Sequence, residues 1–389
     1  MFQGLRSLCA LTAITVAIGM AGCNGQQSTA MQSNVMPAAP VAHPHVVGPS
    51  GKPQLAVSSC TPCYTYQNGP SSEYEYAYNK QTPHRSMSNG VAAPWVGLVF
   101  DSHGNLFVAN CSTCLTGQAG VNNIVEFTPD QTTPSVTITN GITYPFDLVE
   151  DANNTLYASN LGCYSPSCYG SVSEYAQGYS SGPPTTSVQV KYPLGLAIDT
   201  NGNLYVANCA ICSSGQTGSD QILVYAPGQT TPFRTITTGI NEPVSIALDS
   251  SNDLYVANCM NCGLGAAAYV SGSDSITEYS TSSNTPVKTI SYSTKDIPFS
   301  IAVDSSADLF VANLAVNSVT EYPPNATVPS RTLTQGISGP ASIAVNKQGV
   351  LYVSNSGTQT ITEYPARRHS GNPVRTLAVN YPSSIAVWR

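Results

Sequence analysis

The feature that most constrains the fold of this chain is a repeated phrase, one copy of which is divided between the two ends of the sequence. The complete phrase occupies residues 193–208 and reads Pro-Leu-Gly-Leu-Ala-Ile-Asp-Thr-Asn-Gly-Asn-Leu-Tyr-Val-Ala-Asn. Its last copy stops after the first third, at residues 382–389, and the continuation stands near the N-terminus, at residues 54–60. A linear array has no reason to divide a repeat in this way, whereas a closed ring does. The sequence therefore predicts a ring.

The length of the repeat indicates what each unit of the ring is. Copies begin at Trp95, Pro145, Pro193, Pro243, Pro298, Pro340 and Pro382, which spaces them 42–55 residues apart. In the unit that starts at Pro193, short apolar or alternating runs occupy residues 195–198, 204–207, 222–225 and 234–236, with turn residues between them. That pattern is typical of a four-stranded antiparallel meander, the blade of a β-propeller. We name its strands a to d in chain order.

Two rows of side chains give the number of blades. The aromatic row in strand c is Tyr76, Phe127, Tyr175, Tyr225, Tyr279, Tyr322 and Tyr364, and the apolar row in strand d is Met87, Ile138, Val188, Ile236, Ile290, Leu333 and Leu377. Both rows have seven members only if residues 53–93 supply strands b, c and d of a blade whose strand a is 384–387. We therefore predict an all-β fold, a seven-bladed β-propeller of four-stranded antiparallel blades. Its last blade is closed by strand a from the C-terminus and strands b, c and d from the N-terminus.

The repeated phrase also resembles a known family. The pattern Ile-Ala-x-Asp-x-x-Gly-x-Leu-Tyr-Val-Ala-Asn is similar to the NHL repeat over about 335 residues of the chain. This resemblance implies a propeller that serves as a binding scaffold, a lyase or a hydrolase, with streptogramin-lyase-like propellers as the nearest seven-bladed comparison. The chain departs from the family pattern by ending strand b in Asn rather than Asp, at Asn110, Asn160, Asn208, Asn258, Asn313 and Asn355. We expect these side chains to cap the b–c loop through hydrogen bonds to the backbone.

The first part of the chain is predicted to be a targeting segment and a tether. Residues 1–22 carry Arg6 and then an apolar run that is short for a membrane span, which indicates a signal peptide of the lipoprotein type. The sequence Met20-Ala21-Gly22-Cys23 resembles a bacterial lipobox, so Cys23 is the expected site of lipidation; ordinary cleavage nearby is the alternative. Residues 23–52 are expected to be a disordered tether, and 53–389 the propeller. We expect an exported lipoprotein, periplasmic or at the cell surface, attached to the membrane by its lipid alone.

The charge of the chain argues against nucleic acid as a partner. Only 9% of the residues are charged and the formal net charge is −7. The 14 Lys and Arg residues form no cluster in the sequence. Binding to the phosphate backbone requires a concentrated basic face, which this sequence does not predict.

The remaining cysteines follow strand b in five units. They form the pairs Cys60 and Cys63, Cys111 and Cys114, Cys163 and Cys168, Cys209 and Cys212, and Cys259 and Cys262. Zinc would need two such pairs at one ion, and covalent haem would need a histidine after the second cysteine. In an exported protein a local disulfide in each pair is the expected arrangement, with thiol redox chemistry or metal binding as alternatives. Because the pairs occur only where the b–c connection is long, we interpret them as staples at the base of inserted loops.

The alternation of strand directions predicts where these loops lie. If strand a starts at one face of the ring, called here the top face, the b–c and d–a connections share that face and the a–b turns lie at the opposite, bottom face. Five adjacent blades would then carry stapled loops around the channel mouth. The units at 298–339 and 340–381, which have short connections, would leave a notch.

Candidate ligand-binding residues come from the starts of the a strands. Two residues after each start stand Gly97, Asp147, Gly195, Ser245, Ser300, Ser342 and Ser384. Asp147 is the exception among small residues, and we interpret it as a hydrated channel residue or as the anchor of a ligand. Trp95, Phe146 and Phe299 belong to an apolar rim, which is either packed beneath the loops or the floor of a cup for a peptide, glycan or partner loop.

These observations favour a binding or scaffolding module over an enzyme. Of the five histidines, His43 and His45 fall in the tether, His84 and His369 flank outer strands, and His103 lies in an a–b turn, so the usual general base is missing from the predicted mouth. We expect no catalytic residue, no metal ligand and no cofactor, a monomer, and an envelope protein, peptide or glycan as the partner. The alternative is a metal-assisted lyase or hydrolase in which Asp147 and carbonyl oxygens hold a divalent cation at the channel mouth.

Overall fold

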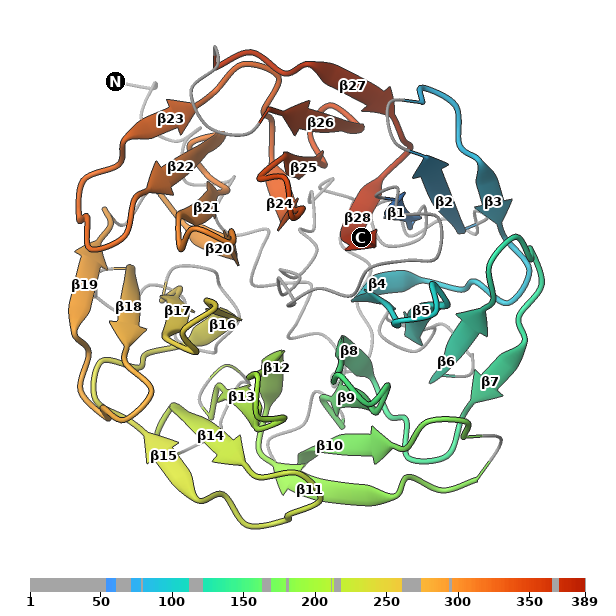
Figure 1. Ribbon diagram of the computed structural model, residues 1–389, viewed down its shortest axis with the longest axis horizontal. Coiled ribbons are helices and arrows are strands. Elements are labelled where there is room, and N and C mark those ends of the chain that lie inside the picture. The colour runs from blue at the N-terminus through green and yellow to red at the C-terminus, as the bar shows by residue number, and fades with distance from the viewer. Residues whose placement is uncertain are drawn as a thin grey trace, which may run out of the picture.

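The computed structural model is a closed ring of seven blades around a central axis (Figure 1). It describes residues 54–60, 71–77, 80–111, 122–162, 169–179, 182–210, 212, 218–260, 274–293, 296–365 and 371–388, with the side chains of residues 54, 95 and 96 excepted. Every blade is a sheet of four strands that pair antiparallel in the order a, b, c, d from the axis outward. The predicted seven-bladed β-propeller is therefore confirmed. Within these ranges, no helix has the length and the apolar character needed to cross a membrane.

The blades are numbered from the one that closes the ring. Blade 1 consists of β28 (Pro382–Trp388), β1 (Gln54–Ser59), β2 (Ser72–Ala77) and β3 (Arg85–Met87). Blade 2 consists of β4 (Pro94–Phe100), β5 (Leu106–Cys111), β6 (Asn122–Phe127) and β7 (Val136–Ile138). Blade 3 consists of β8 (Pro145–Glu150), β9 (Leu156–Asn160), β10 (Gly170–Tyr175) and β11 (Thr186–Val190). Blade 4 consists of β12 (Pro193–Ile198), β13 (Leu204–Asn208), β14 (Gln221–Tyr225) and β15 (Arg234–Ile236).

The remaining three blades repeat this order without interruption. Blade 5 consists of β16 (Pro243–Leu248), β17 (Leu254–Asn258), β18 (Ser275–Tyr279) and β19 (Lys288–Ser291). Blade 6 consists of β20 (Pro298–Val303), β21 (Leu309–Asn313), β22 (Ser318–Tyr322) and β23 (Arg331–Leu333). Blade 7 consists of β24 (Pro340–Val345), β25 (Leu351–Asn355), β26 (Thr360–Tyr364) and β27 (Arg375–Ala378).

The divided repeat closes the ring as the sequence predicts. Strand β28 pairs with β1 from Gln54 opposite Trp388 to Ser59 opposite Pro382. The Cys60 amide then donates to the carbonyl oxygen of Tyr381 at 3.1 Å. One sheet thus joins the two ends of the described chain: β1 is paired on both sides, and β28 is the inner strand of the blade, at the axis.

The core of the molecule lies between neighbouring blades. One cluster joins Ile222 and Val224 of blade 4 to Ile246 and Val256 of blade 5, and all four side chains are fully buried. The other seams repeat this arrangement with residues at corresponding positions. Both faces of each sheet are therefore buried, which explains why strands such as β13 and β17 are buried along their whole length and apolar up to the final asparagine.

The a–b turns on the bottom face are alike in length and hydrogen bonding. In blades 2 to 7 five residues separate strand a from strand b, as between Phe100 and Leu106. The turn is closed by one side chain that accepts two backbone amides: Asp199 Oδ1 accepts from Asn201 and Asn203, both at 2.8 Å. The same two bonds recur at Asp101, Asp151, Asp249, Asp304 and Asn346. These bonds hold the a–b turns of this face in one repeated conformation.

Candidate functional site

The candidate site is the top face, where the a strands begin. The pairing of Pro193 with Asn208 places the start of strand a beside the end of strand b, so the d–a and b–c connections share this face as predicted. The connections differ greatly in length. Four residues lie between Asn313 and Ser318 in blade 6, whereas sixteen lie between Asn258 and Ser275 in blade 5. The five longer connections fall largely outside the described residues, so the predicted ring of loops stays a prediction.

The row of small residues at the axis binds neighbouring blades to one another. In each of blades 6, 7 and 1 the strand-a register shifts near the first proline, and an amide of strand a points toward the preceding blade. Three of these bonds run from the amides of Ile301, Ile343 and Ile385 to the hydroxyls of Ser245, Ser300 and Ser342, at 3.3, 3.3 and 3.2 Å. The row was expected to be small because the axis is crowded. Its hydroxyls also satisfy buried amides across the seams.

Asp147 occupies this row and serves two seams at once. Its Oδ2 accepts the amide of Leu196 in blade 4 at 2.8 Å, the bond that serine makes elsewhere. Its Oδ1 accepts the amide of Leu148 in its own blade at 2.9 Å. The preceding blade has Gly97 in the row and offers no side chain for that second amide. The carboxyl is 2% exposed, so it is a buried seam residue and not the hydrated channel residue that we expected.

Burial raises the pKa of Asp147 well above its usual range, and the two backbone amides oppose this shift. With both oxygens engaged, the side chain has little capacity left to anchor a ligand. Across the described ranges no group of three or more His, Cys, Asp or Glu residues is arranged to hold a metal ion. The geometry therefore gives the metal-centred alternative no support from Asp147.

Replacing Asp147 by alanine is expected to destabilise the ring by about 2–4 kcal/mol, because two buried amides lose their acceptor at about 1–3 kcal/mol each. The matched control is Ser245→Ala, which removes one longer bond, to Ile301. It should cost about 1 kcal/mol, the low end of that range, because one amide loses a longer and weaker bond. Urea denaturation of both variants measures the difference. Equal losses in the two variants would contradict the double role of Asp147.

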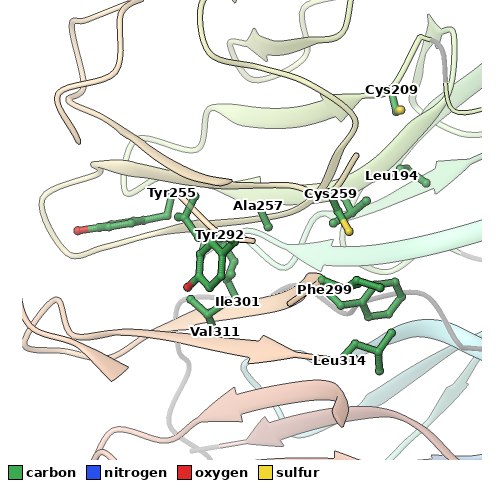
Figure 2. Packing of buried hydrophobic residues seen from close by; sticks show 14 of the residues in the cluster. Leu194, Cys209, Tyr255, Ala257, Cys259, Tyr292, Phe299, Ile301, Val311 and Leu314 are labelled. Carbon is green, nitrogen blue, oxygen red and sulfur yellow. The ribbon is translucent and has the colours of Figure 1, made fainter. Parts of the chain in front are cut away.

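The apolar rim is packed. Phe146 and Phe299 are 8% and 4% exposed and belong to one buried cluster with Leu194 and Leu314. Figure 2 shows Phe299 on its strand beside Leu314, with Cys259 and Leu194 of the neighbouring blades close by. The side chain of Trp95 lies outside what the structure describes. For the two phenylalanines the packing interpretation fits, and the open cup floor does not.

The first cysteine of each pair is held at the base of its connection. The amides of Cys111, Cys209 and Cys259 donate to carbonyl oxygens of the residue before the strand-a proline, at 3.0–3.2 Å. Cys209 and Cys212 form a disulfide with a Cα–Cα distance of 5.3 Å, which confirms the predicted pairing there. Cys60, Cys111 and Cys259 are also disulfide-bonded. The other members of the predicted pairs, Cys63, Cys114, Cys163, Cys168 and Cys262, and the lipidation site Cys23, lie outside the described residues.

The asparagines that end strand b act differently from our prediction. We expected them to cap the b–c loop that follows, but their side chains bind the connection that enters strand a. Asn110 Oδ1 accepts the Ala92 amide at 2.8 Å, and its Nδ2 donates to the Gly90 carbonyl at 2.8 Å. Asn160, Asn258 and Asn355 accept corresponding amides at 2.9–3.1 Å, and Asn208 accepts the amide one residue later, at 3.1 Å. Asn313 is the exception, because its Oδ1 has no hydrogen-bond partner in the described part of the chain. An amide side chain can accept and donate at once, which a carboxylate cannot, and this explains Asn in place of Asp.

Two buried glutamates near the top face escaped the sequence analysis. Burial raises the pKa of Glu73 and of Glu242 to about 8. Each has one carboxylate oxygen without a hydrogen-bond partner in the described part of the chain. Alignment of the repeats could have found both, because the other residues in these rows carry no charge. Glu73 aligns with Ile124, Val172, Ile222, Ile276, Val319 and Ile361, and Glu242 with Ala93, Tyr144, Tyr192, Ile297, Gly339 and Tyr381.

The histidines that the structure describes lie away from the top face. His103 is in an a–b turn, as predicted, and its side chain is 59% exposed. His84 precedes β3 and contacts Asp130 at 3.0 Å on the exposed outer side. His43, His45 and His369 fall outside the described residues. Within the described chain, no histidine is placed to act as a general base at the channel mouth.

Comparison with known proteins identifies the fold and goes no further. No protein-family model matches the chain, and no curated protein does. Two solved structures similar to it are candidate 6-phosphogluconolactonases. The one from Bacteroides fragilis has a TM-score of 0.63 and 13% identity, covering 87% of this chain and 98% of its own. The one from Bacteroides uniformis has a TM-score of 0.62 and 12% identity, covering 86% and 99%.

A chain from a nidogen–laminin complex is similar at a TM-score of 0.50, with 12% identity over 86% of this chain and 98% of that one. At such identities the likeness establishes the β-propeller fold alone. The resemblance to the NHL-repeat family stays a prediction.

Proposed function

We propose that this protein is an exported binding module of the bacterial cell envelope. It would be anchored through a lipid on Cys23 and would capture an envelope protein, peptide or glycan on its top face. The observation that carries the proposal is the difference between the two faces. The a–b turns are alike in length and hydrogen bonding in blades 2 to 7, whereas the b–c connections range from four to sixteen residues. A scaffold with alike turns on one face and loops of widely varied length on the other is typical of proteins that bind through loops.

The position of the tether supports this orientation. Gln54, the first residue of β1, lies opposite Trp388, the last described residue of β28. Since strand a runs from the top face to the bottom face, the chain enters the propeller at the bottom. A lipid anchor at Cys23 would then hold the bottom face toward the membrane and present the top face away from it.

The enzymatic alternative has less support. A metal-assisted lyase or hydrolase centred on Asp147 would need free carboxylate oxygens, and both oxygens of Asp147 accept backbone amides. The lactonase activity in the names of the two Bacteroides proteins belongs to chains only 12–13% identical to this one. Their likeness therefore carries no catalytic residue over to this sequence.

Exchange of one loop tests the proposal. In the variant, the residues between Asn258 and Ser275 are replaced by the four-residue connection of blade 6, Leu-Ala-Val-Asn. The strands flanking both connections have the same length, so the fold should be kept. We expect capture of the envelope partner to fall at least tenfold, measured by quantitative mass spectrometry of material retained from an envelope extract on immobilised protein.

The control exchanges a connection on the other face. The residues between Tyr322 and Arg331 in blade 6 are replaced by the equally long connection between Tyr225 and Arg234 in blade 4. This variant should retain the partner at the wild-type level. If the bottom-face exchange loses the partner and the top-face exchange keeps it, the assignment of the binding face is wrong.

A further inference from the structure

A cross-strand ion pair recurs near the outer, bottom side of the blades. In four blades a glutamate of strand c lies opposite a basic residue of strand d, and the two side chains form an ion pair. The pairs are Glu75 with Arg85, Glu278 with Lys288, Glu321 with Arg331, and Glu363 with Arg375. The same arrangement of charges therefore occurs in several blades, so that a blade that departs from it can be compared with those that keep it.

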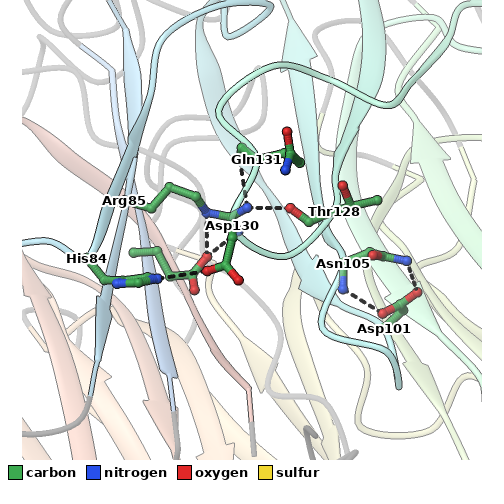
Figure 3. A network of polar contacts seen from close by, with 8 residues as sticks. His84, Arg85, Asp101, Asn105, Thr128, Asp130 and Gln131 are labelled. Carbon is green, nitrogen blue, oxygen red and sulfur yellow. Dashed lines mark hydrogen bonds and ion pairs between the residues drawn. The ribbon is translucent and has the colours of Figure 1, made fainter. Parts of the chain in front are cut away.

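Arg85 shows what this environment binds. Its guanidinium contacts the carboxylate of Glu75 through two nitrogens. It also donates to the Thr128 and Gln131 carbonyl oxygens, at 2.5 and 2.8 Å, in the c–d turn of the next blade (Figure 3). Arg375 reaches the corresponding turn of blade 1 through the Lys80 carbonyl at 2.7 Å. A carboxylate and two carbonyl oxygens therefore surround one planar cation across a blade seam.

Blade 4 supports the same conclusion in a simpler form. It has Val224 opposite Arg234, so the carboxylate is absent. Arg234 nevertheless donates to the carbonyl oxygens of Ser280 and Ser283 in the next c–d turn. The turn carbonyls bind a guanidinium even without a counter-ion.

Blade 3 has the carboxylate of strand c and faces the same turn carbonyls, but it lacks the basic residue of strand d. Glu174 of strand c lies opposite Thr186, where other blades carry Arg or Lys. Burial raises the pKa of Glu174, a hydrogen bond from Thr186 opposes the shift, and the charge of Asp151 adds to it. The next c–d turn presents the Ala226 and Gln229 carbonyls at the positions of Thr128 and Gln131. Its geometry is the same, since the Ala226 oxygen accepts the Gln229 amide at 3.0 Å as the Thr128 oxygen accepts the Gln131 amide at 3.1 Å.

A cavity occupies the place of the missing side chain. It lies between blades 3 and 4, is small and open to solvent, and is lined by Tyr157, Glu174, Thr186, Ala226 and Gln229 among others. Gly228 at its edge is exposed and has nothing within 4 Å of where a Cβ would stand, which leaves the entrance clear.

The corresponding space at the preceding seam is filled. Blade 2 also lacks the cation, with Glu126 opposite Val136. There Tyr179, from the turn of blade 3, packs against Phe107 and Tyr175 with ring centroids 6.1 and 5.7 Å away. Tyr179 thus fills the space of the missing basic side chain between blades 2 and 3, while the corresponding space between blades 3 and 4 stays open.

We propose that the cavity between blades 3 and 4 is a binding site for a guanidinium group supplied from outside the chain. Glu174 and the carbonyl oxygens of Ala226 and Gln229 would accept the donors of that group, as Glu75, Thr128 and Gln131 accept those of Arg85. Tyr157 provides an aromatic wall. At the corresponding position in blade 5 the ammonium of Lys288 lies 5.5 Å from the ring centroid of Tyr255. The source is either a small guanidinium compound or an arginine side chain of a partner protein.

Thermal melts with methylguanidinium chloride test the proposal. At 1–20 mM, against equal sodium chloride, the wild type should show saturable stabilisation with a Kd on the order of 1 mM, since so few atoms bind no more tightly. The shift in Tm should be about 1–2 °C. Thr186→Arg places an internal guanidinium in the cavity, so it should raise Tm and abolish the response. Glu174→Gln should weaken binding about tenfold.

Arg85→Thr is the matched variant at another seam. It opens a corresponding cavity and should acquire a response to methylguanidinium. The proposal is overturned if the wild type shows no saturable response while Arg85→Thr does, or if Thr186→Arg responds as the wild type does. If Arg85→Thr does not fold, the comparison of wild type with Thr186→Arg decides alone.

The peptide acetyl-Gly-Arg-Gly-amide identifies the source. Binding of this peptide as strong as that of methylguanidinium, or stronger, indicates an arginine of a partner protein. Binding of methylguanidinium alone indicates a small guanidinium compound.

Discussion

Removal of residues 382–389 is expected to unfold the whole ring and not the last blade alone. Strand β28 pairs with β1 and packs on the neighbouring blades: the Ser383 hydroxyl donates to the Pro94 carbonyl at 2.8 Å, and the Trp388 ring stacks 5.9 Å from Phe100. Its loss exposes a blade face on each side and leaves β1 as a free edge. We expect Tm to fall by more than about 15 °C, or the cooperative transition to disappear, in a melt followed by circular dichroism.

Two further samples show whether the expected loss of stability comes from opening the ring or only from removing the Trp388 side chain. Trp388→Ala keeps the strand and should cost about 3–5 kcal/mol, the usual range for a buried tryptophan. Residues 382–389 supplied as a separate peptide should restore part of the transition of the truncated protein. A truncated protein that melts within a few degrees of the intact one would show that β28 does not close the ring.

Replacing Glu73 by glutamine is expected to stabilise the protein, and more so at high pH. The side chain is 0% exposed, and burial raises its pKa from 4.5 to about 8, with a hydrogen bond from Ser58 as the smaller, opposing effect. A folded-state pKa above the unfolded one means that the protonated form favours folding. The contribution is therefore fully present below about pH 4.5 and is lost as the pH rises to about 8. A gap of about 3.5 pH units corresponds to roughly 5 kcal/mol as an upper bound.

The difference in unfolding free energy between Glu73→Gln and the wild type should thus be small at pH 4.5 and reach several kcal/mol at pH 8.5. Urea denaturation at the two pH values measures it. Glu150 and Glu242, whose pKa values burial raises to about 9 and about 8, should make the wild type itself more stable in mild acid. They contribute equally to both proteins and cancel in the comparison. A difference that does not change with pH would show that Glu73 is ionised in the folded state throughout this range.

The sequence was sufficient to predict the fold because each blade states its own pattern. The aromatic and apolar rows counted the blades, and the divided phrase located the closure between β28 and β1. The strand bounds of the unit at Pro193 were predicted to within two residues at each end. Because the pattern is repeated in every blade, each strand could be located from several copies and not from one.

The contacts of the candidate site were harder to predict, because they cross from one blade to the next. Asp147 stood out as the one carboxylate in a row of small residues, but its role depends on Leu196 in blade 4 and on the absence of a side chain at Gly97. The asparagines were assigned to the wrong connection for the same reason. A repeat alignment says which residues occupy equivalent positions, and it does not say which neighbour a side chain reaches after the strand-a bulge.

The alignment of the repeats also contains two residues that depart from their rows. Glu73 stands in a row of valine and isoleucine, and Thr186 in a row rich in arginine. Each exception points to a physical change, a buried acid in one case and a missing cation in the other. Departures from a row are therefore a useful guide to where a repeat protein differs from a plain scaffold.

The closure of blade 1 also bears on how the chain acquires its structure during synthesis. Gln54 pairs with Trp388, so the first strand of the propeller to leave the ribosome gains its inner neighbour only after the last strand has been made. Until then β1 presents an open edge that a strand of another molecule can occupy. The yield of folded protein in cells should therefore depend on chaperones that keep unfinished copies apart, more strongly than the stability of the finished ring would suggest.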